Sequence, residues 1–295
     1  MHNFNIPKEK QIRVILNTDV KNEVDDQFAI VHAILSQSFD LRGIIPAHFG
    51  TEKSLHSQRD SYDETMLLLN KMDLPKKINV LNGAEHALTD KFSPIDSEGS
   101  QLIIEESMKD DERPLYIAFL GPLTDMASAI LLKPEICERN IKVIWIGGRD
   151  WPCGGWEYNL NNDIIAANIV FQSSVELWQI PRNVYRMMPV SFAELWKKVY
   201  PFGAIGKYLT ENVISFNNAR KERPAEYRIL GDSPAIGVIL YNDCGKWSWC
   251  PAPEFDENMN YIHNGKHRAI KVYSSIDSRF ILEDFYAKLS LFCDS

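Results

Sequence analysis

The sequence predicts an α/β fold of three layers, in which helices cover both faces of a mostly parallel central sheet. Continuous apolar runs alternate with segments of helical periodicity, and these runs lack the polar alternation of a half-exposed strand. Such runs are typical of strands buried on both faces, which implies parallel pairing with helices above and below. No repeat, low-complexity tract or Gly/Ser linker divides the chain. We therefore expect one domain over residues 1–295.

The positions of the elements follow from these patterns. Strands are expected at residues 13–18, 41–47, 78–83, 115–121, 141–148, 175–180, 183–188 and 268–277. Helices are expected at residues 25–36, 52–71, 123–132, 163–171, 207–224, 233–244 and 277–291. Two helix starts have a local signal, an aspartate pair at 25–26 and a Ser-Pro pair at 233–234. The Trp- and Pro-rich run 247–253 is expected to form a surface loop, with a lid or an interface as the alternative. The basic run 219–228 is expected to be a solvated helix end, and the alternative is that it places Arg220, Lys221 or Arg223 near a charged tail of a substrate.

Composition narrows the class of protein. The chain is 45% hydrophobic and 24% charged, as in a folded globular protein. Its net charge of −8 argues against a nucleic-acid binder, which normally presents a basic face. No apolar run approaches the roughly 18 residues of a membrane span, and the N-terminus has no apolar core of signal-peptide length. The five cysteines include no C-x-x-C pair, as expected of reduced thiols, so we predict a cytoplasmic protein without nucleic-acid or membrane partners.

Three aspartates, Asp19, Asp25 and Asp26, follow the first predicted strand. In parallel sheets ligands bind outside the carboxyl ends of the strands, so these side chains lie where a site is expected. Capping of the next helix explains one aspartate but not three, because neighbouring carboxylates repel one another. A divalent cation removes this repulsion, and ligands that are all oxygens favour Ca²⁺ or Mg²⁺ over zinc. Asp232, beside the helix start at Ser233, is either a fourth carboxylate of such a site or a residue that complements the helix dipole.

Four segments, in this order, resemble the motifs of the nucleoside hydrolase family, the inosine–uridine-preferring N-ribohydrolases. They are NTDVKNEVDDQFAI (17–30), LGPLTDMASAI (120–130), WEYNLNNDIIAA (156–167) and GDSPAIGVI (231–239). The family patterns are Asp-Thr-Asp-Pro-Gly-x-Asp-Asp, G-P-L-T-N-x-A, A-E-F-N-x-x-x-D-P-x-A-A and H-D-x-x-A. Asn17 replaces the first aspartate of the first pattern, and the loop after Asp19 is two residues longer. The resemblance spans nearly the whole chain and implies a divergent member with the family's fold.

The resemblance also implies a role for individual residues. The implied calcium ligands are Asp19, Asp26, Asp232 and the backbone carbonyl of Leu120, with Ca²⁺ favoured over Mg²⁺. Asp19 would also deprotonate a metal-bound water, and Asp25 would bind a ribose hydroxyl. Glu157 and Asn159 would hold the outer ribose hydroxyls. A base of this kind and several sugar contacts suit cleavage of an N-glycosidic bond, which develops positive charge on the sugar.

One departure concerns the leaving group. The family often has a histidine directly before the last metal aspartate, where it can protonate the departing base, and here that position is Gly231. His48, after the second strand, is expected near the sugar, and Tyr158 is expected to contact the substrate from the loop around Glu157. His86 is a further candidate for the missing acid. A packing role is the alternative for each of these side chains.

These observations favour a metal-dependent hydrolase of N-glycosidic bonds in ribonucleosides or related N-ribosides, with a small-molecule riboside as its substrate. A catalytically impaired protein that binds ribose or nucleosides is one alternative, and a hydrolase of a different glycoside is another. A phosphatase of the haloacid dehalogenase type is excluded because Asn17 stands where its nucleophilic aspartate is required. The family resemblance implies a homodimer or homotetramer.

Overall fold

The computed structural model describes residues 4–293, whose central feature is a sheet of seven strands. In spatial order these are β2 (Phe39–Pro46), β1 (Ile12–Thr18), β3 (Leu115–Phe119), β4 (Ile141–Ile146), β5 (Glu176–Ile180), β11 (Ala269–Tyr273) and β8 (Trp247–Pro251). Every neighbouring pair is parallel except β11 and β8. The prediction of a mostly parallel α/β sheet is confirmed.

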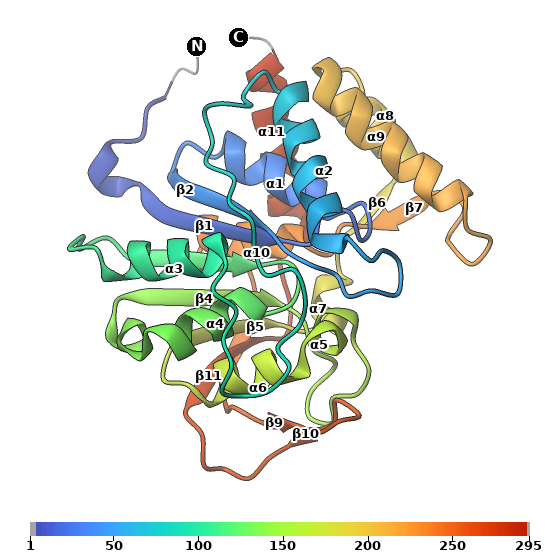
Figure 1. Cartoon of the computed structure of the whole chain (residues 1–295). Helices are drawn as coiled ribbons and strands as arrows, with labels where there is room; N and C mark the ends of the chain where they lie inside the picture. The colour runs from blue at the N-terminus through green and yellow to red at the C-terminus, as the bar shows by residue number, and fades with distance from the viewer. Residues whose placement is uncertain (1–3, 294–295) are drawn as a thin grey trace.

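Helices cover both faces of this sheet. The longer ones are α1 (Asp26–Leu35), α2 (Ser57–Lys71), α3 (Glu98–Met108), α4 (Thr124–Leu132), α6 (Ile164–Gln172), α9 (Gly203–Asn218), α10 (Ser233–Leu240) and α11 (Ser278–Cys293). Consecutive residues of β1 point to opposite sides, so Val14 and Leu16 join the core with α1, α10 and α11, and Ile15 joins the core with α3, α4 and α6. Figure 1 shows α1 and α2 in the upper half of the molecule and α4 and α6 in the lower half. The expected third layer is therefore present.

The remaining elements are short. They are α5 (Tyr158–Asn162), α7 (Arg182–Tyr185), α8 (Phe192–Lys198), the 3₁₀ turns Lys8–Lys10 and Pro134–Glu138, and two pairs of small strands, β6 (Pro189–Ser191) with β7 (Tyr227–Ile229) and β9 (Glu254–Phe255) with β10 (Tyr261–Ile262). No helix among residues 4–293 is long and apolar enough to cross a membrane.

Local predictions are wrong in several places, and helix α3 was not predicted. Residues 183–188 form no strand, because Pro181 starts the short helix α7 there. Residues 78–83 contribute only an isolated bridge between Val80 and Ile44. The run 247–253 contains β8, which pairs antiparallel with β11 at the sheet edge. Short apolar or aromatic runs have no periodicity that distinguishes a strand from a short helix or a loop, and tertiary contacts determine which of these forms.

Candidate active site

The sheet has a topological switch point at β1, which lies between β2 and β3. The chain leaves β1 at Asp19 and leaves β3 at Leu120, and these strands are parallel neighbours. Their carboxyl ends therefore open side by side, which is where open α/β sheets bind ligands. A cavity of about 340 Å³ lies at this point, within the usual range of small-molecule sites.

The cavity contains most of the predicted site residues. Its lining includes Asp19, Asp25, Asp26, Leu120, Glu157, Tyr158, Asn159 and Asp232. These residues come from the ends of β1 and β3, the starts of α1 and α10, and the segment around α5. The structure thus brings together four sequence segments that are separated by up to two hundred residues. The lengthened loop after Asp19 also contributes, through Asn22 and Glu23.

Three carboxylates meet closely in the cavity. Asp25, Asp26 and Asp232 each offer an oxygen within 4.8 Å of the others. Neither Asp25 nor Asp232 caps the helix that it precedes. Asp25 instead accepts a hydrogen bond from the backbone N–H of Gly231 at 2.9 Å, and Asp26 accepts one from the Thr18 hydroxyl at 2.5 Å. Helix capping therefore does not account for this cluster.

Asp19 lies beside the three carboxylates and is buried. Burial and the nearby charges of Asp26 and Asp25 raise its pKa well above the usual range. Among residues 4–293, the side chain that donates a hydrogen bond to it is the Asn22 amide, at 3.3 Å. The carboxylate fits because position 121 is glycine: a Cβ on Gly121 would lie 2.9 Å from Asp19 Cγ.

The chemistry of these groups fits a hard divalent cation. Burial, together with Asp25, raises the pKa of Asp26 to about 7, and burial and Asp26 raise that of Asp232 well above its usual value. Buried carboxylates packed this closely are stabilised when a cation lies between them. No histidine or cysteine lines the cavity among the described residues, so the donor set is oxygen alone, as Ca²⁺ and Mg²⁺ prefer.

The Leu120 carbonyl, the expected backbone ligand, lines the cavity and accepts a hydrogen bond from Asn159 Nδ2 at 2.7 Å. Asn159 Nδ2 also donates to the Ile146 carbonyl at 2.8 Å, so its Oδ1 is the atom left for a ligand. A carbonyl oxygen has two lone pairs, which leaves Leu120 able to accept a second partner. The amide of Asn159 therefore fixes the two strand ends that frame the cavity.

Glu157 is the second acidic centre of the cavity, and it is buried. Its Oε2 accepts hydrogen bonds from the backbone N–H of Gly148 and of Leu160, at 2.9 and 3.0 Å. Its Oε1 accepts one from the Tyr185 hydroxyl at 3.0 Å. These contacts fix the orientation of the carboxylate. Tyr158 lies near the mouth, where its hydroxyl donates to the Phe49 carbonyl at 3.2 Å.

The two histidines that were predicted near the site, His48 and His86, do not line the cavity. His48 does not line the cavity, which corrects the expectation that it contacts the sugar. The Thr124 hydroxyl donates its proton to Asp163, so it accepts a hydrogen bond from His48 Nε2. His48 Nδ1 accepts a hydrogen bond from the backbone N–H of Gly50. Both nitrogens of the neutral ring are therefore satisfied, and burial lowers its pKa to about 4. His86 also lies outside the cavity, with its ring against its neighbour's carbonyl.

Two departures from the family motifs contact one another. Asn17 stands where the family has aspartate, and Asp125 stands where its G-P-L-T-N motif has asparagine. In the structure Asn17 Nδ2 donates to Asp125 Oδ2 at 2.9 Å, and both side chains are buried. Relative to the family motifs the amide and the carboxylate are exchanged between β1 and α4, and in this chain they form one amide–carboxylate hydrogen bond.

Sequence reasoning missed several lining residues. Tyr185 and Arg186 lie in residues 183–188, which were predicted as a strand, and Arg182 directly precedes them. Arg223 and Arg228 come from the run that we expected to be a solvated helix end. A signal was available for the first group, because Arg182 follows directly on the carboxyl end of β5, the position that marks ligand sites in such sheets.

Fold and site together define a class of protein: an α/β protein with an acidic, cation-compatible cavity at the switch point of its sheet. The model of the family described as inosine-uridine preferring nucleoside hydrolase matches residues 14–272. The chain therefore belongs to this family of N-glycosyl hydrolases.

Known relatives agree with this assignment. The probable uridine nucleosidase 2 of Arabidopsis thaliana is 23% identical over 219 residues, which cover 67% of each chain. The pyrimidine-specific ribonucleoside hydrolase RihA of Escherichia coli is 26% identical over 178 residues, and this chain spans only 54% of its length.

Solved structures show the same fold. The purine-preferring ribonucleoside hydrolase from Gardnerella vaginalis superposes with a TM-score of 0.79 at 21% identity. The plant nucleoside hydrolase PpNRh1 superposes with a TM-score of 0.77 at 17% identity. In both cases the match covers 95% of this chain and 99% of the other.

Proposed function

We propose that this protein hydrolyses the N-glycosidic bond of ribonucleosides or related N-ribosides in the acidic cavity, with a bound divalent cation, Ca²⁺ in preference to Mg²⁺. The observation that carries the proposal is the convergence of Asp19, Asp25, Asp26 and Asp232 at the switch point of the sheet. Four carboxylates in one buried place raise the free energy of the fold unless they serve a ligand. Membership of the nucleoside hydrolase family supports hydrolysis of N-glycosidic bonds as the reaction at this site.

The residues that would hold the cation are Asp19, Asp26 and Asp232, with the carbonyl of Leu120. A divalent cation supplies Lewis acidity that lowers the pKa of a water, and it offsets the carboxylate charge. In the proposed reaction Asp19 accepts the proton of the attacking water. The developing positive charge on the sugar is stabilised by the surrounding carboxylates.

The same cavity offers groups that would position the sugar. Asp25 belongs to the carboxylate cluster, and Glu157 and Asn159 come from the segment around α5. We propose that these three side chains accept hydrogen bonds from ribose hydroxyls. Orientation of this kind can supply part of the roughly 7–11 kcal/mol that positioning offers in principle. Glu157 suits this role because its carboxylate is held by two backbone N–H groups and Tyr185.

The leaving base meets aromatic side chains rather than a histidine. Trp156, Tyr158 and Tyr227 line the cavity, and Trp156 and Tyr227 are also exposed to solvent, as expected at an entrance. The family's histidine position is Gly231, where a Cβ would lie 3.1 Å from the Tyr185 ring and 3.2 Å from Asp25. The space for an acid at this position is therefore filled, and we propose that stacking on the aromatic side chains holds the base.

Release of ribose from a panel of purine and pyrimidine ribonucleosides, with Ca²⁺ present, tests the proposal. We expect release by the wild type and a loss of at least about a hundredfold in Asp19→Asn, since general base catalysis is typically worth ~10²–10⁴-fold. Asp243→Asn, an exposed aspartate outside the cavity, is the matched control and should keep full activity. No release from any riboside would refute the proposal, and tight binding without release would favour the alternative of a ribose-binding protein.

We also propose, from the cysteine pattern, that the protein is cytoplasmic, and, from the family resemblance, that it forms a homodimer or homotetramer. Light scattering of the purified protein tests the oligomeric state. A monomer at micromolar concentration would contradict it.

A further inference from the structure

Arginines gather around the acidic cavity. Its lining contains Arg182, Arg186, Arg223 and Arg228. They come from two segments that are distant in sequence, the α7 region and the chain leading into and through β7. Four guanidinium groups are not needed to bind a neutral nucleoside, whose sugar and base offer only hydroxyls, amides and ring nitrogens.

Neutralising the protein's own carboxylates does not account for all four arginines. Arg223 and Arg228 both pair with Glu23, the former at 2.6 Å. By contrast, Arg182, which is half-buried, and Arg186, which is exposed, make no ion pair or side-chain hydrogen bond with any described residue. The donors of these two side chains are therefore available to a ligand.

The paired arginines also have unused donors. Arg228 is buried, and only its Nη2 has a carboxylate partner. The Nε atoms of Arg228 and Arg223 are both buried without a hydrogen-bond partner among the described residues. A buried donor without a partner is costly, and the cost is removed when a ligand supplies an acceptor. A guanidinium presents its N–H groups in a fork that matches phosphate and carboxylate oxygens.

The arginines lie next to the groups that would hold the sugar. Arg228 Nη2 is 3.9 Å from Asp25 Oδ1. Arg182 begins the short helix that ends at Tyr185, whose hydroxyl donates to Glu157. An anionic group attached to a riboside held by Asp25 and Glu157 would therefore lie in the same cavity as these arginines.

The charge of the cavity agrees with this arrangement. Four arginines line it together with six carboxylates, those of Asp19, Glu23, Asp25, Asp26, Glu157 and Asp232. A divalent cation in the aspartate cluster brings the lining to formal neutrality. Four of the six acids are buried, whereas Arg182 is half-buried and Arg186 is exposed, so these two guanidinium groups are more accessible to an incoming ligand than most of the acids.

We propose that the substrates of this site are ribosides that carry an anionic group, a phosphate on the sugar or a carboxylate on the base, which Arg182, Arg186 and Arg228 bind. This proposal rests on the proposed N-riboside hydrolysis and names its substrate class. It predicts that a neutral nucleoside is the poorer substrate, because it leaves the arginines without a partner.

The test compares kcat/KM for uridine, uridine 5′-monophosphate and orotidine, measured as release of the base in the presence of Ca²⁺. We expect at least one anionic riboside to exceed uridine by about tenfold or more, the effect of a hydrogen bond between charged groups. Preference for the 5′-monophosphate assigns the arginines to a sugar phosphate, and preference for orotidine assigns them to an acidic base. Equal or lower kcat/KM for both anionic ribosides would overturn the proposal.

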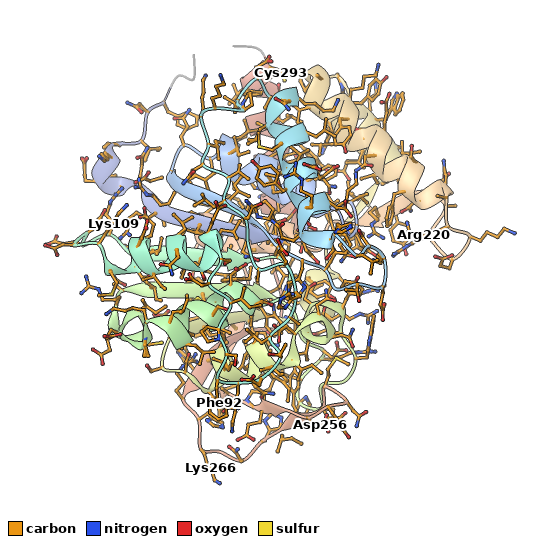
Figure 2. All side chains as sticks on the ribbon, in the orientation of Figure 1. Phe92, Lys109, Arg220, Asp256, Lys266 and Cys293 are labelled. Carbon is orange, nitrogen blue, oxygen red and sulfur yellow. The ribbon has the colours of Figure 1, made fainter. Side chains whose placement is uncertain are left out.

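Variants connect this preference to the arginines. Arg182→Gln and Arg186→Gln break no ion pair within the described chain, and each should lower the ratio of anionic to neutral kcat/KM by about tenfold. Arg220→Gln is the matched control. Arg220, labelled in Figure 2 just after α9, lies over the Phe216 ring at 3.9 Å and does not line the cavity. The Arg220→Gln substitution removes the same charge from a neighbouring segment and should leave the ratio of anionic to neutral kcat/KM unchanged.

The preference for anionic ribosides can be tested even if the proposed hydrolysis is refuted. If no riboside is cleaved, hydrolysis is refuted, and calorimetry of the wild type with uridine and the two anionic ribosides still decides the substrate class. Tighter binding of an anionic riboside, weakened in Arg186→Gln, would support the proposal. Binding of uridine at least as tight as that of both anionic ribosides would overturn it.

Discussion

The exchange of Asn17 and Asp125 predicts a specific pattern of stability. Asp125 is buried and accepts hydrogen bonds from the Ser97 hydroxyl at 2.6 Å, the Ala84 N–H at 2.9 Å and Asn17 Nδ2 at 2.9 Å. Asn17→Asp replaces the third donor by an acceptor. A hydrogen bond to a charged group is worth about 1.5–3 kcal/mol, and a second buried carboxyl adds a further cost. We therefore expect a loss of at least about 2 kcal/mol in the free energy of unfolding.

The second change should restore the pair. In the double variant Asn17→Asp/Asp125→Asn the donor and the acceptor are exchanged, as in the family motifs. Urea unfolding at pH 7.5 of the wild type, the two single variants and the double variant gives the coupling energy of the pair. We expect the loss of unfolding free energy in the double variant to be about 2 kcal/mol smaller than the sum of the losses in the two single variants. Losses that simply add would refute the view that these two departures compensate one another.

Three further predictions concern single positions. Between pH 7.5 and 5 the wild type should lose about 2 kcal/mol more unfolding free energy than His48→Gln. The pKa of His48 is about 4 in the folded protein and 6.5 in the unfolded chain, so the unfolded chain binds the proton first as the pH falls. Equal losses of the two proteins in urea unfolding would contradict this. Gly121→Ala would bring a Cβ to 2.9 Å from Asp19 Cγ and should weaken Ca²⁺ binding about tenfold or more by calorimetry; unchanged affinity would argue against Asp19 as a ligand. Tyr185→Phe removes the donor to Glu157 and should lower kcat/KM for ribosides about tenfold with Ca²⁺ affinity unchanged; a normal kcat/KM would show that Glu157 needs no such support.

Much of the fold could be predicted from the sequence because buried parallel strands have a local signature. The runs around β1, β3 and β4 are mostly apolar, and each precedes a glycine or an acid at the strand end. The run at 183–188 misled because four helical residues after Pro181 are too few to show a period of 3.6. β8 has no apolar run of its own and is defined by its pairing with β11.

The site was predictable where its residues mark the ends of elements. Asp19, Asp26 and Asp232 stand at such ends, and their acidity is unusual enough to be seen in the sequence alone. Arg228 could not be found in this way, because its burial against Glu23 depends on a contact between segments about two hundred residues apart. His48 was placed correctly at a strand end, but its ring packs toward Thr124 rather than into the cavity. Which way a side chain points from a loop depends on neighbours that the sequence does not reveal.

Calorimetric titration of Ca²⁺ into chelator-treated protein tests most directly whether the acidic cavity is a cation site. The wild type should bind one Ca²⁺ per chain at the cavity, Asp232→Asn should lose most of this affinity, and Asp243→Asn should bind like the wild type. Absence of binding by the wild type, or equal binding by all three proteins, would contradict the assignment of the carboxylate cluster to a metal ion.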